Sequence, residues 1–383
     1  MQVKQVVVKS VSALASAADL FKPLQAIAPQ WVLVFGGVNF FTDPAMPVAL
    51  KAAFPDAVLM GCSTAGEIGG EAVSNDQCVV TAVNFANTKM RVTTTALANM
   101  DDSHAAGVRV GEQLMADDLK AVMVLAPGVQ INGSALVDGI ASWVGRKLPI
   151  TGGLAGDGGA FAQTWTLSPA GVSADGVVAI GLYGDALDFA HGSFGGWEPF
   201  GPARKVTRCA GNVLYELDGE PALEVYKRYL GDHAKSLPAS GLLFPFAMLG
   251  EDHDALGLIR TILGVDEAAG SLTLAGAIDP NGYLKLMHAS TDRLVDGAES
   301  AAEAAKQMFK ADGDSLAVLV SCVGRKLVMG DRVDEEVEAV ADVFGSKAVL
   351  TGFYSYGEIS PFTPGSACQL HNQTMTITWI CEH

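Results

Sequence analysis

Short apolar runs recur along the chain at residues 31–37, 121–128 and 316–322, and turn-forming residues follow each run. Continuous apolar runs of this length are typical of strands that are buried on both faces. After two of these runs, apolar residues return with helical spacing in residues 134–144 and 331–344. A second apolar strand then follows each helix. The pattern therefore predicts units of strand, helix and strand, the size of a βαβ crossover.

The second strand of each unit ends in a repeated motif. VLMGCSTAGEI begins at Val58 and VLTGFYSYGEI begins at Val349, and six of the eleven positions agree. A third relative, PITGGLAGDG, begins at Pro149 and puts Asp157 where the other two motifs have glutamate. We therefore expect the first and last units to superpose, with the middle unit as a looser third copy.

Further β-forming stretches follow each unit and are predicted to be antiparallel additions to its sheet. The predicted fold class is therefore α/β, with repeated βαβ units, added antiparallel strands, mixed sheets and two pseudo-equivalent halves. Residues 195–205 contain two prolines and three glycines, which is the strongest break in composition along the chain. We place a hinge between the halves at this segment.

Charge and cysteine content narrow the class of protein. The chain of 383 residues has 25 basic and 42 acidic residues, a net charge of −17, which disfavours nucleic acid and anionic membranes as partners. The six cysteines form no CxxC pair, so a zinc knuckle is not expected. No apolar run is long enough for a membrane span and no signal peptide is evident. We expect a cytoplasmic protein with reduced thiols and no membrane insertion.

The repeated corners are the first candidates for a ligand site, because ligands gather at the carboxyl ends of strands in α/β sheets. Glu67, Glu358 and Asp157 are candidate acceptors for a ligand ammonium group. Gly61, which opens the first motif, lets the backbone approach a ligand closely. The alternative is that the glycines only make turns and that the carboxylates cap nearby backbone amides.

Arg325 and two tyrosines extend this candidate site. Arg325 follows a strand end and is able to hold a ligand carboxylate in a bidentate fork, or else is a solvated residue at a strand terminus. Tyr354 and Tyr356 flank the second corner, and the alternation of a strand would put both rings on one face. They are predicted either to wall a pocket or to belong to the core.

Cys62 and Ser63 lie at a sharp turn after a strand, which resembles a nucleophile elbow. The pattern is not G-x-S-x-G, and the sequence puts no histidine beside it. A hydrolase needs an assembled base and an oxyanion hole. We therefore favour a buried polar corner at Cys62 and Ser63 over a catalytic one, and we expect no enzyme activity.

Several motifs together resemble the FIST family of sensory domains: GCSTAGEI, GGLAGDG, GNVLYELDGEPAL, SCVGR and GFYSYGEISP with ACQLHNQTMT. The resemblance covers nearly the whole chain and implies a FIST N-terminal domain at 1–218 and a FIST C-terminal domain at 219–383. It also implies a sensory role in which a small ligand binds, with amino acids as proposed ligands. A subset of stand-alone bacterial members binds haem, senses nitric oxide and acts on a histidine kinase.

Membership of the haem-binding subset would require a histidine that ligates iron. His371 lies in a family motif and is the first candidate for an iron ligand, followed by His288 and then His191. Alternatively, His371 belongs to a polar structural network with Asn372 and Gln373. The leading hypothesis is a non-enzymatic sensor that binds a small ligand and regulates a signalling partner. A haem-based nitric oxide sensor and a Cys- or Ser-dependent enzyme are its rivals.

Overall fold

Three βαβ units form the framework of the part of the chain that the structure describes. The computed structural model describes residues 1–308, 313–363 and 365–383. In each unit the two strands are parallel neighbours. The units are β2 (Trp31–Gly36), α3 (Val38–Phe41), α4 (Ala45–Ala53) and β3 (Val58–Ser63); β8 (Leu119–Ala126), α6 (Gly133–Val144) and β9 (Ile150–Leu154); and β23 (Ser315–Cys322), α9 (Val323–Met329), α10 (Asp334–Phe344) and β24 (Ala348–Ser355).

Each unit is the centre of a six-stranded mixed sheet, and the three sheets have the same strand order. An antiparallel pair of strands lies beside the first strand of each unit, and a short hairpin pairs with the second. The first sheet adds β1 (Gln2–Val8), β6 (Cys78–Asn84), β10 (Thr166–Ser168) and β11 (Gly171–Ser173); the second adds β7 (Lys89–Ala96), β12 (Gly176–Tyr183), β25 (Gly357–Pro361) and β26 (Cys368–His371); the third adds β13 (Leu187–Phe194), β27 (Met375–Glu382), β4 (Glu67–Gly69) and β5 (Ala72–Ser74). The predicted fold class, mixed α/β with repeated βαβ units and antiparallel additions, is confirmed.

The hairpins are exchanged between the sheets in a cycle. The hairpin that follows β3 pairs with β24, the hairpin that follows β24 pairs with β9, and the hairpin that follows β9 pairs with β3. Each corner after a βαβ unit is therefore the point where the chain leaves its own sheet for the next. The three sheets form one interlocked body, called the three-sheet body below.

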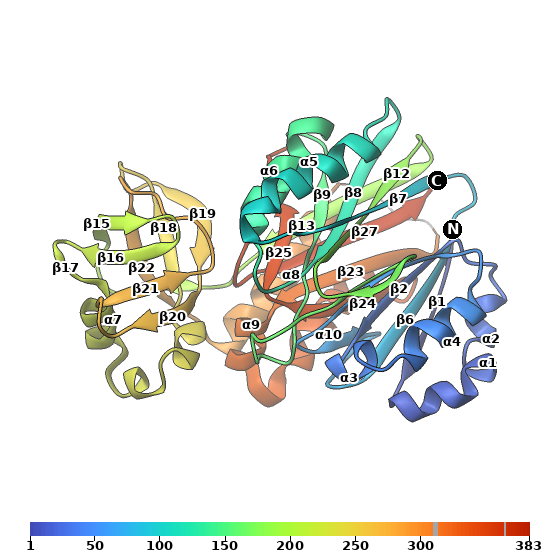
Figure 1. Ribbon diagram of the computed structural model, residues 1–383, viewed down its shortest axis with the longest axis horizontal. Coiled ribbons are helices and arrows are strands. Elements are labelled where there is room, and N and C mark those ends of the chain that lie inside the picture. The colour runs from blue at the N-terminus through green and yellow to red at the C-terminus, as the bar shows by residue number, and fades with distance from the viewer. Residues whose placement is uncertain (309–312, 364) are drawn as a thin grey trace.

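The core of this body lies between the inner faces of the sheets. Leu33 from the first sheet, Leu125 from the second and Val320 from the third are all almost completely buried there. Phe35 stacks on Phe353 across two sheets, with ring centroids 4.8 Å apart. Helices cover the outer faces (Figure 1): α1 (Ala17–Leu20), α2 (Lys22–Gln25), α3 and α4 on the first sheet, α5 (Ser103–Leu114) and α6 on the second, and α8 (Thr291–Lys306) and α10 on the third.

The repeated glycine of the motif has a steric cause. A Cβ atom at Gly61 would overlap the carbonyl oxygen of Val34 on the neighbouring parallel strand. The equivalent glycines, Gly152 and Gly352, face a carbonyl oxygen in the same way. The two parallel strands of each unit thus approach so closely that only glycine fits at this position.

A separate sheet, with nine strands in the described ranges, is inserted between β13 and α8, and it lies at one end of the molecule in Figure 1. The chain passes into it through residues 195–205, the segment in which the sequence predicts a hinge. The predicted domain boundary at 218/219 falls in the turn between two strands of this sheet. Its elements are β14 (Glu198–Pro199), β15 (Arg204–Ala210), β16 (Val213–Leu217), β17 (Glu220–Pro221), α7 (Ala222–Leu230), β18 (Phe246–Leu249), β19 (Ala255–Arg260), β20 (Ile262–Asp266), β21 (Ser271–Leu274) and β22 (Tyr283–His288).

The helices of the described ranges are short. None of them combines the length and the apolar character that crossing a lipid bilayer requires.

Candidate ligand-binding site

The structure brings the three corners together. Ala65 N donates to Tyr354 O (2.9 Å) and Tyr354 N donates to Gly66 O (2.8 Å), which joins the first corner to the third. Gly156 N donates to Ser63 O (2.8 Å), which joins the second corner to the first. The predicted site residues of the corners are therefore neighbours in space, although they lie far apart in the sequence.

Glu67 and Glu358 occupy equivalent positions and make equivalent bonds. Thr64 Oγ1 donates to one carboxylate oxygen of Glu67 (2.6 Å), and Ser355 Oγ donates to one of Glu358 (2.6 Å). The second oxygen of each glutamate accepts a backbone N–H from the loop before the next long strand, at Gln77 (3.1 Å) and at Thr374 (3.1 Å). Burial raises the pKa of both carboxyls, that of Glu358 to about 8.

The middle unit departs from the comparison of the three motifs. Glu67 and Glu358 each pair with the residue that follows the repeated glycine of a neighbouring unit. In the remaining unit, the residue at that position pairs with Thr166 and not with Asp157. The placement of Asp157 at the glutamate position is therefore wrong, because the chain makes a longer loop between β9 and β10 than the alignment assumes.

Asp157 and Tyr356 order that longer loop. The carboxylate of Asp157 accepts the backbone N–H groups of Phe161 (2.8 Å) and Ala162 (2.7 Å), and it accepts the hydroxyl of Tyr356. The Tyr356 ring stacks on Phe161 with centroids 4.0 Å apart. Both predicted site residues thus contact the protein itself. For Asp157 this is the capping arrangement that the sequence leaves open as an alternative.

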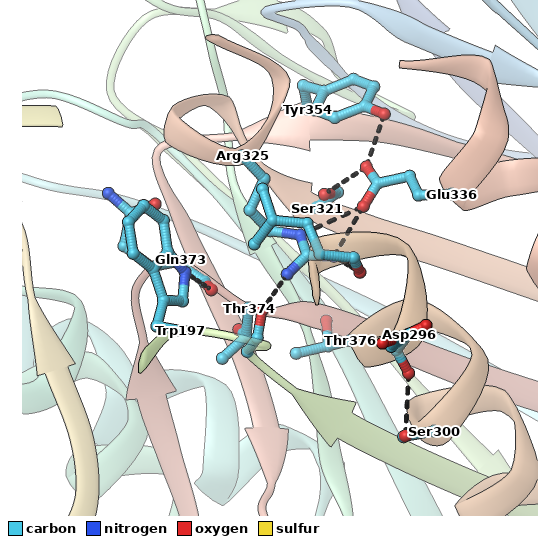
Figure 2. Close-up of polar contacts among 12 residues, drawn as sticks. Trp197, Asp296, Ser300, Ser321, Arg325, Glu336, Tyr354, Gln373, Thr374 and Thr376 are labelled. Carbon is cyan, nitrogen blue, oxygen red and sulfur yellow. Dashed lines mark hydrogen bonds and ion pairs between the residues drawn. The ribbon is translucent and has the colours of Figure 1, made fainter. Parts of the chain in front are cut away.

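Arg325 does hold a carboxylate, but the carboxylate belongs to the protein. Arg325 Nη2 and Nε lie 2.7 and 3.1 Å from Glu336 Oε2, and both side chains are fully buried. Tyr354 Oη (2.6 Å) and Ser321 Oγ (2.9 Å) donate to the other oxygen of Glu336 (Figure 2). The ring of Tyr354 is therefore a core group that completes this buried network.

The same guanidinium reaches both connections between the three-sheet body and the inserted sheet. Arg325 donates to Gly195 O, where the chain leaves the body, and to Leu294 O (2.8 Å), where it has returned. The network of Arg325 and Glu336 thus fixes the base of the inserted sheet.

The corner formed by Cys62 and Ser63 is closed. Ser63 Oγ donates to Gly156 O (2.7 Å) and accepts from Trp165 N (2.9 Å), and neither Ser63 nor Cys62 is exposed. Burial raises the pKa of the Cys62 thiol well above its usual value, so the thiol is held in its weakly nucleophilic neutral form.

The predicted haem ligands lie in different environments. His371 Nε2 is 2.9 Å from Ser360 O, the side chain is 1% exposed, and the Phe362 ring lies 5.7 Å away. Burial lowers its pKa to about 4, so the ring is neutral. His288 is an exposed residue at the end of β22 in the inserted sheet, with its ring at the edge of Phe200.

A haem ligand needs a free imidazole nitrogen that faces an open apolar slot. The packing around His371 does not fit haem, because the side chain is 1% exposed and the Phe362 ring lies beside it, so neither ring nitrogen faces an open slot. His191, the third candidate, is also buried, and burial lowers its pKa to about 4.

The turn before β27 carries unpaired polar atoms and contacts the inserted sheet. Among the described residues, Ser193 Oγ on β13 and Asn372 Oδ1 and Gln373 Oε1 in the turn before β27 are buried without a hydrogen-bond partner. Gln373 Nε2 donates across to the inserted sheet, to Leu242 O (3.0 Å) and Thr261 Oγ1 (3.0 Å). We call this contact zone, between residues 371–374 and residues 255–261, the seam.

Two features were not identified from the sequence, Lys326 at the first corner and the seam. Lys326 Nζ lies 2.5 Å from Ala65 O and 5.4 Å from the centre of the Tyr354 ring, so it covers the first corner. Burial lowers its pKa. The sequence feature that pointed to Lys326 was its position beside Arg325 in the SCVGRK stretch. The seam itself has no local sequence signal, because segments that are distant in the sequence form it.

The fold and the site define a mixed α/β protein with three interlocked units, an inserted sheet and a buried polar seam between them. The family model of the FIST N domain matches residues 30–220 and that of the FIST C domain matches residues 222–361, and the chain belongs to the FIST family. FIST domains are associated with signal transduction through small-ligand binding.

Individual relatives add little. A stretch of 94 residues, 24% of this chain, is 37% identical to an uncharacterized protein of Methanocaldococcus jannaschii, and it spans 18% of that protein's length. A cyanuric acid hydrolase from A. caulinodans is similar in structure over 100% of this chain and 98% of its own, with a TM-score of 0.40 and 11% identity. Neither likeness transfers an activity to this chain.

Proposed function

We propose that the protein is a non-enzymatic sensor that binds a small ligand at the seam and regulates a signalling partner, such as a histidine kinase. The observation that carries this proposal is the pair of buried, unpaired acceptors, Asn372 Oδ1 and Gln373 Oε1. An unpaired buried polar atom costs about 1–3 kcal/mol, so proteins leave few of them without a functional reason. A ligand with hydrogen-bond donors would satisfy both oxygens.

Binding at the seam would be reported through the position of the inserted sheet. Gln373 already joins the three-sheet body to the inserted sheet by its hydrogen bonds to Leu242 and Thr261. Trp197 Nε1 also donates to Gln373 O (2.8 Å), beside the connection that Arg325 holds (Figure 2). A ligand that repositions the turn at 372–374 therefore acts on groups that fix the inserted sheet, and a partner protein reads the change.

The closed corner supports a binding role over catalysis. Ser63 has its hydroxyl bonded to backbone groups, and the Cys62 thiol is buried and neutral. We place the sensor in the cytoplasm, a proposal that the six free cysteines support, because thiols stay reduced there.

Hydrogen exchange measured by mass spectrometry, with a panel of small polar metabolites, tests the proposal. We expect a binding metabolite to protect amides in residues 255–261 and 371–374. Asn372→Ala should remove this protection, and Asn87→Ala, at an exposed asparagine of the body, should keep it.

Two results would overturn the proposal. One is a metabolite that protects the three corners and leaves the seam unchanged. The other is a turnover of substrate that Cys62→Ala abolishes, which would establish the enzymatic rival.

A further inference from the structure

Arg260, the last residue of β19, lies at the seam. Its side chain is enclosed, with 5% of the residue exposed, and its positive charge helps to lower the pKa of His371 on the opposite side. The next residue, Thr261, accepts the hydrogen bond from Gln373. Arg260 is therefore a neighbour of the turn that carries the unpaired oxygens.

The backbone around Arg260 is shaped to receive the guanidinium. Nη1 donates to Ile259 O (3.2 Å) and Nε donates to Ala277 O (3.3 Å). Gly276 packs directly on the side chain, because a Cβ atom there would lie 2.7 Å from Nε. Two of the five N–H donors of the guanidinium are used in this way, both by neutral carbonyls.

No carboxylate of the described residues neutralises this charge. The contrast with Arg325 is direct, because Arg325 is also enclosed and has Glu336 at 2.7 Å as its counter-ion. Arg260 forms no ion pair in the described ranges, and burial lowers its pKa only to about 10, so it stays charged at neutral pH. A buried charge without a counter-ion is costly, and titratable groups perturbed in this way cluster at functional sites.

We propose that Arg260 binds the carboxylate of a small organic acid that enters the seam. The planar guanidinium fork matches a carboxylate in two parallel hydrogen bonds. The acid also carries hydroxyl or N–H donors, which Asn372 Oδ1 and Gln373 Oε1 accept. This inference rests on the proposed function, because it assigns the chemistry of the ligand to the same seam.

Thermal unfolding and calorimetric titration with four probes test the assignment: lactate, acetate, lactamide and inorganic phosphate. Lactate has the carboxylate and a donor, acetate lacks the donor, and lactamide lacks the charge. We expect lactate to raise the Tm most, acetate to raise it less and lactamide to leave it unchanged. Arg260→Met should weaken lactate binding at least tenfold.

The same variant separates ligand binding from a structural role. Without an anion, Arg260→Met should have a Tm equal to or above that of the native protein, because an unneutralised buried charge has been removed. Arg293→Met is the matched control, since Arg293 is a half-exposed arginine of α8 paired with Glu198, and its variant should bind lactate normally.

Three results would overturn the assignment. The first is an Arg260→Met variant that unfolds at a lower Tm without an anion and binds lactate as the native protein does. The second is stabilisation by phosphate alone. The third is protection of the seam by lactamide and not by lactate, which would refute the carboxylate and leave the proposed sensor function intact.

Discussion

Single residues at the corners connect neighbouring segments through hydrogen bonds. Glu67 and Glu358 each join a corner hydroxyl to the loop that begins the next long strand. This explains why the motif repeats Gly-Glu-Ile together with a Thr or Ser three residues before the glutamate. The interaction is local and buried, so it stabilises the fold whether or not a ligand contacts the corners.

The raised pKa of Glu358 predicts a pH dependence of stability. Between its ordinary value of 4.5 and its folded value of about 8, the folded state holds a proton that the unfolded state releases. Stability therefore falls as the pH rises through this window, by roughly 1.4 kcal/mol for each unit of pKa shift. Glu358→Gln keeps a neutral group with a donor and an acceptor and should lose this dependence.

Urea unfolding at pH 5 and pH 8.5 measures this effect. The free energy of unfolding of the native protein should fall more between these two conditions than that of Glu358→Gln. Groups that titrate elsewhere contribute equally to both proteins and cancel in the comparison. An equal fall in the two proteins would show that Glu358 is ionised in the folded state at pH 5.

Which residues form the corners was predictable, and most of their contacts were not. The alternation of apolar runs and the glycine, which has no room for a Cβ, identify the strand ends from sequence alone. The alignment misplaced Asp157 because the loop between β9 and β10 is longer than in the other units. The counter-ion of Arg325 was missed because Glu336 lies on the next helix, where an acidic first turn is equally well explained by the helix dipole.

At the scale of elements, α9 and α10 form the base that carries the inserted sheet. Arg325 on α9 holds the two connections at Gly195 and Leu294, and Glu336 on α10 neutralises it. Breaking a buried ion pair by removing one partner typically costs about 3–5 kcal/mol, because the other charge stays buried and unpaired.

Paired substitutions at this base should therefore be less harmful than a single one. Arg325→Met leaves the Glu336 carboxylate unneutralised and should lower the free energy of unfolding by about 3–5 kcal/mol. Arg325→Met with Glu336→Gln removes the stranded charge, and the side-chain amide oxygen introduced by the second substitution still accepts from Tyr354 and Ser321. Chemical denaturation should show the double variant to be more stable than the single one. A double variant that is less stable than Arg325→Met would show that the charge on Glu336 is neutralised by other groups.

At the scale of the whole molecule, hairpin exchange makes the three sheets depend on one another. Each hairpin completes the sheet of a different unit, so no unit is complete without the next. Sequence patterns predict the units and cannot predict this exchange, because a short hairpin pairs equally well with any exposed strand of matching register. The inserted sheet differs, since it has its own core around Leu214, Leu272 and Leu284.

This difference predicts two cooperative units in native-state hydrogen exchange. Leu33→Ala opens a cavity in the core shared by all three sheets, so it should speed exchange in β2, β8 and β23 alike. Leu272→Ala opens an equivalent cavity in the core of the inserted sheet and should speed exchange in β16, β21 and β22 only. The seam and the Arg325 network are the contacts that would couple the two. Faster exchange in β2 and β8 on Leu272→Ala would mean that these contacts bind the molecule into a single unit, and that the inserted sheet does not move independently of the body.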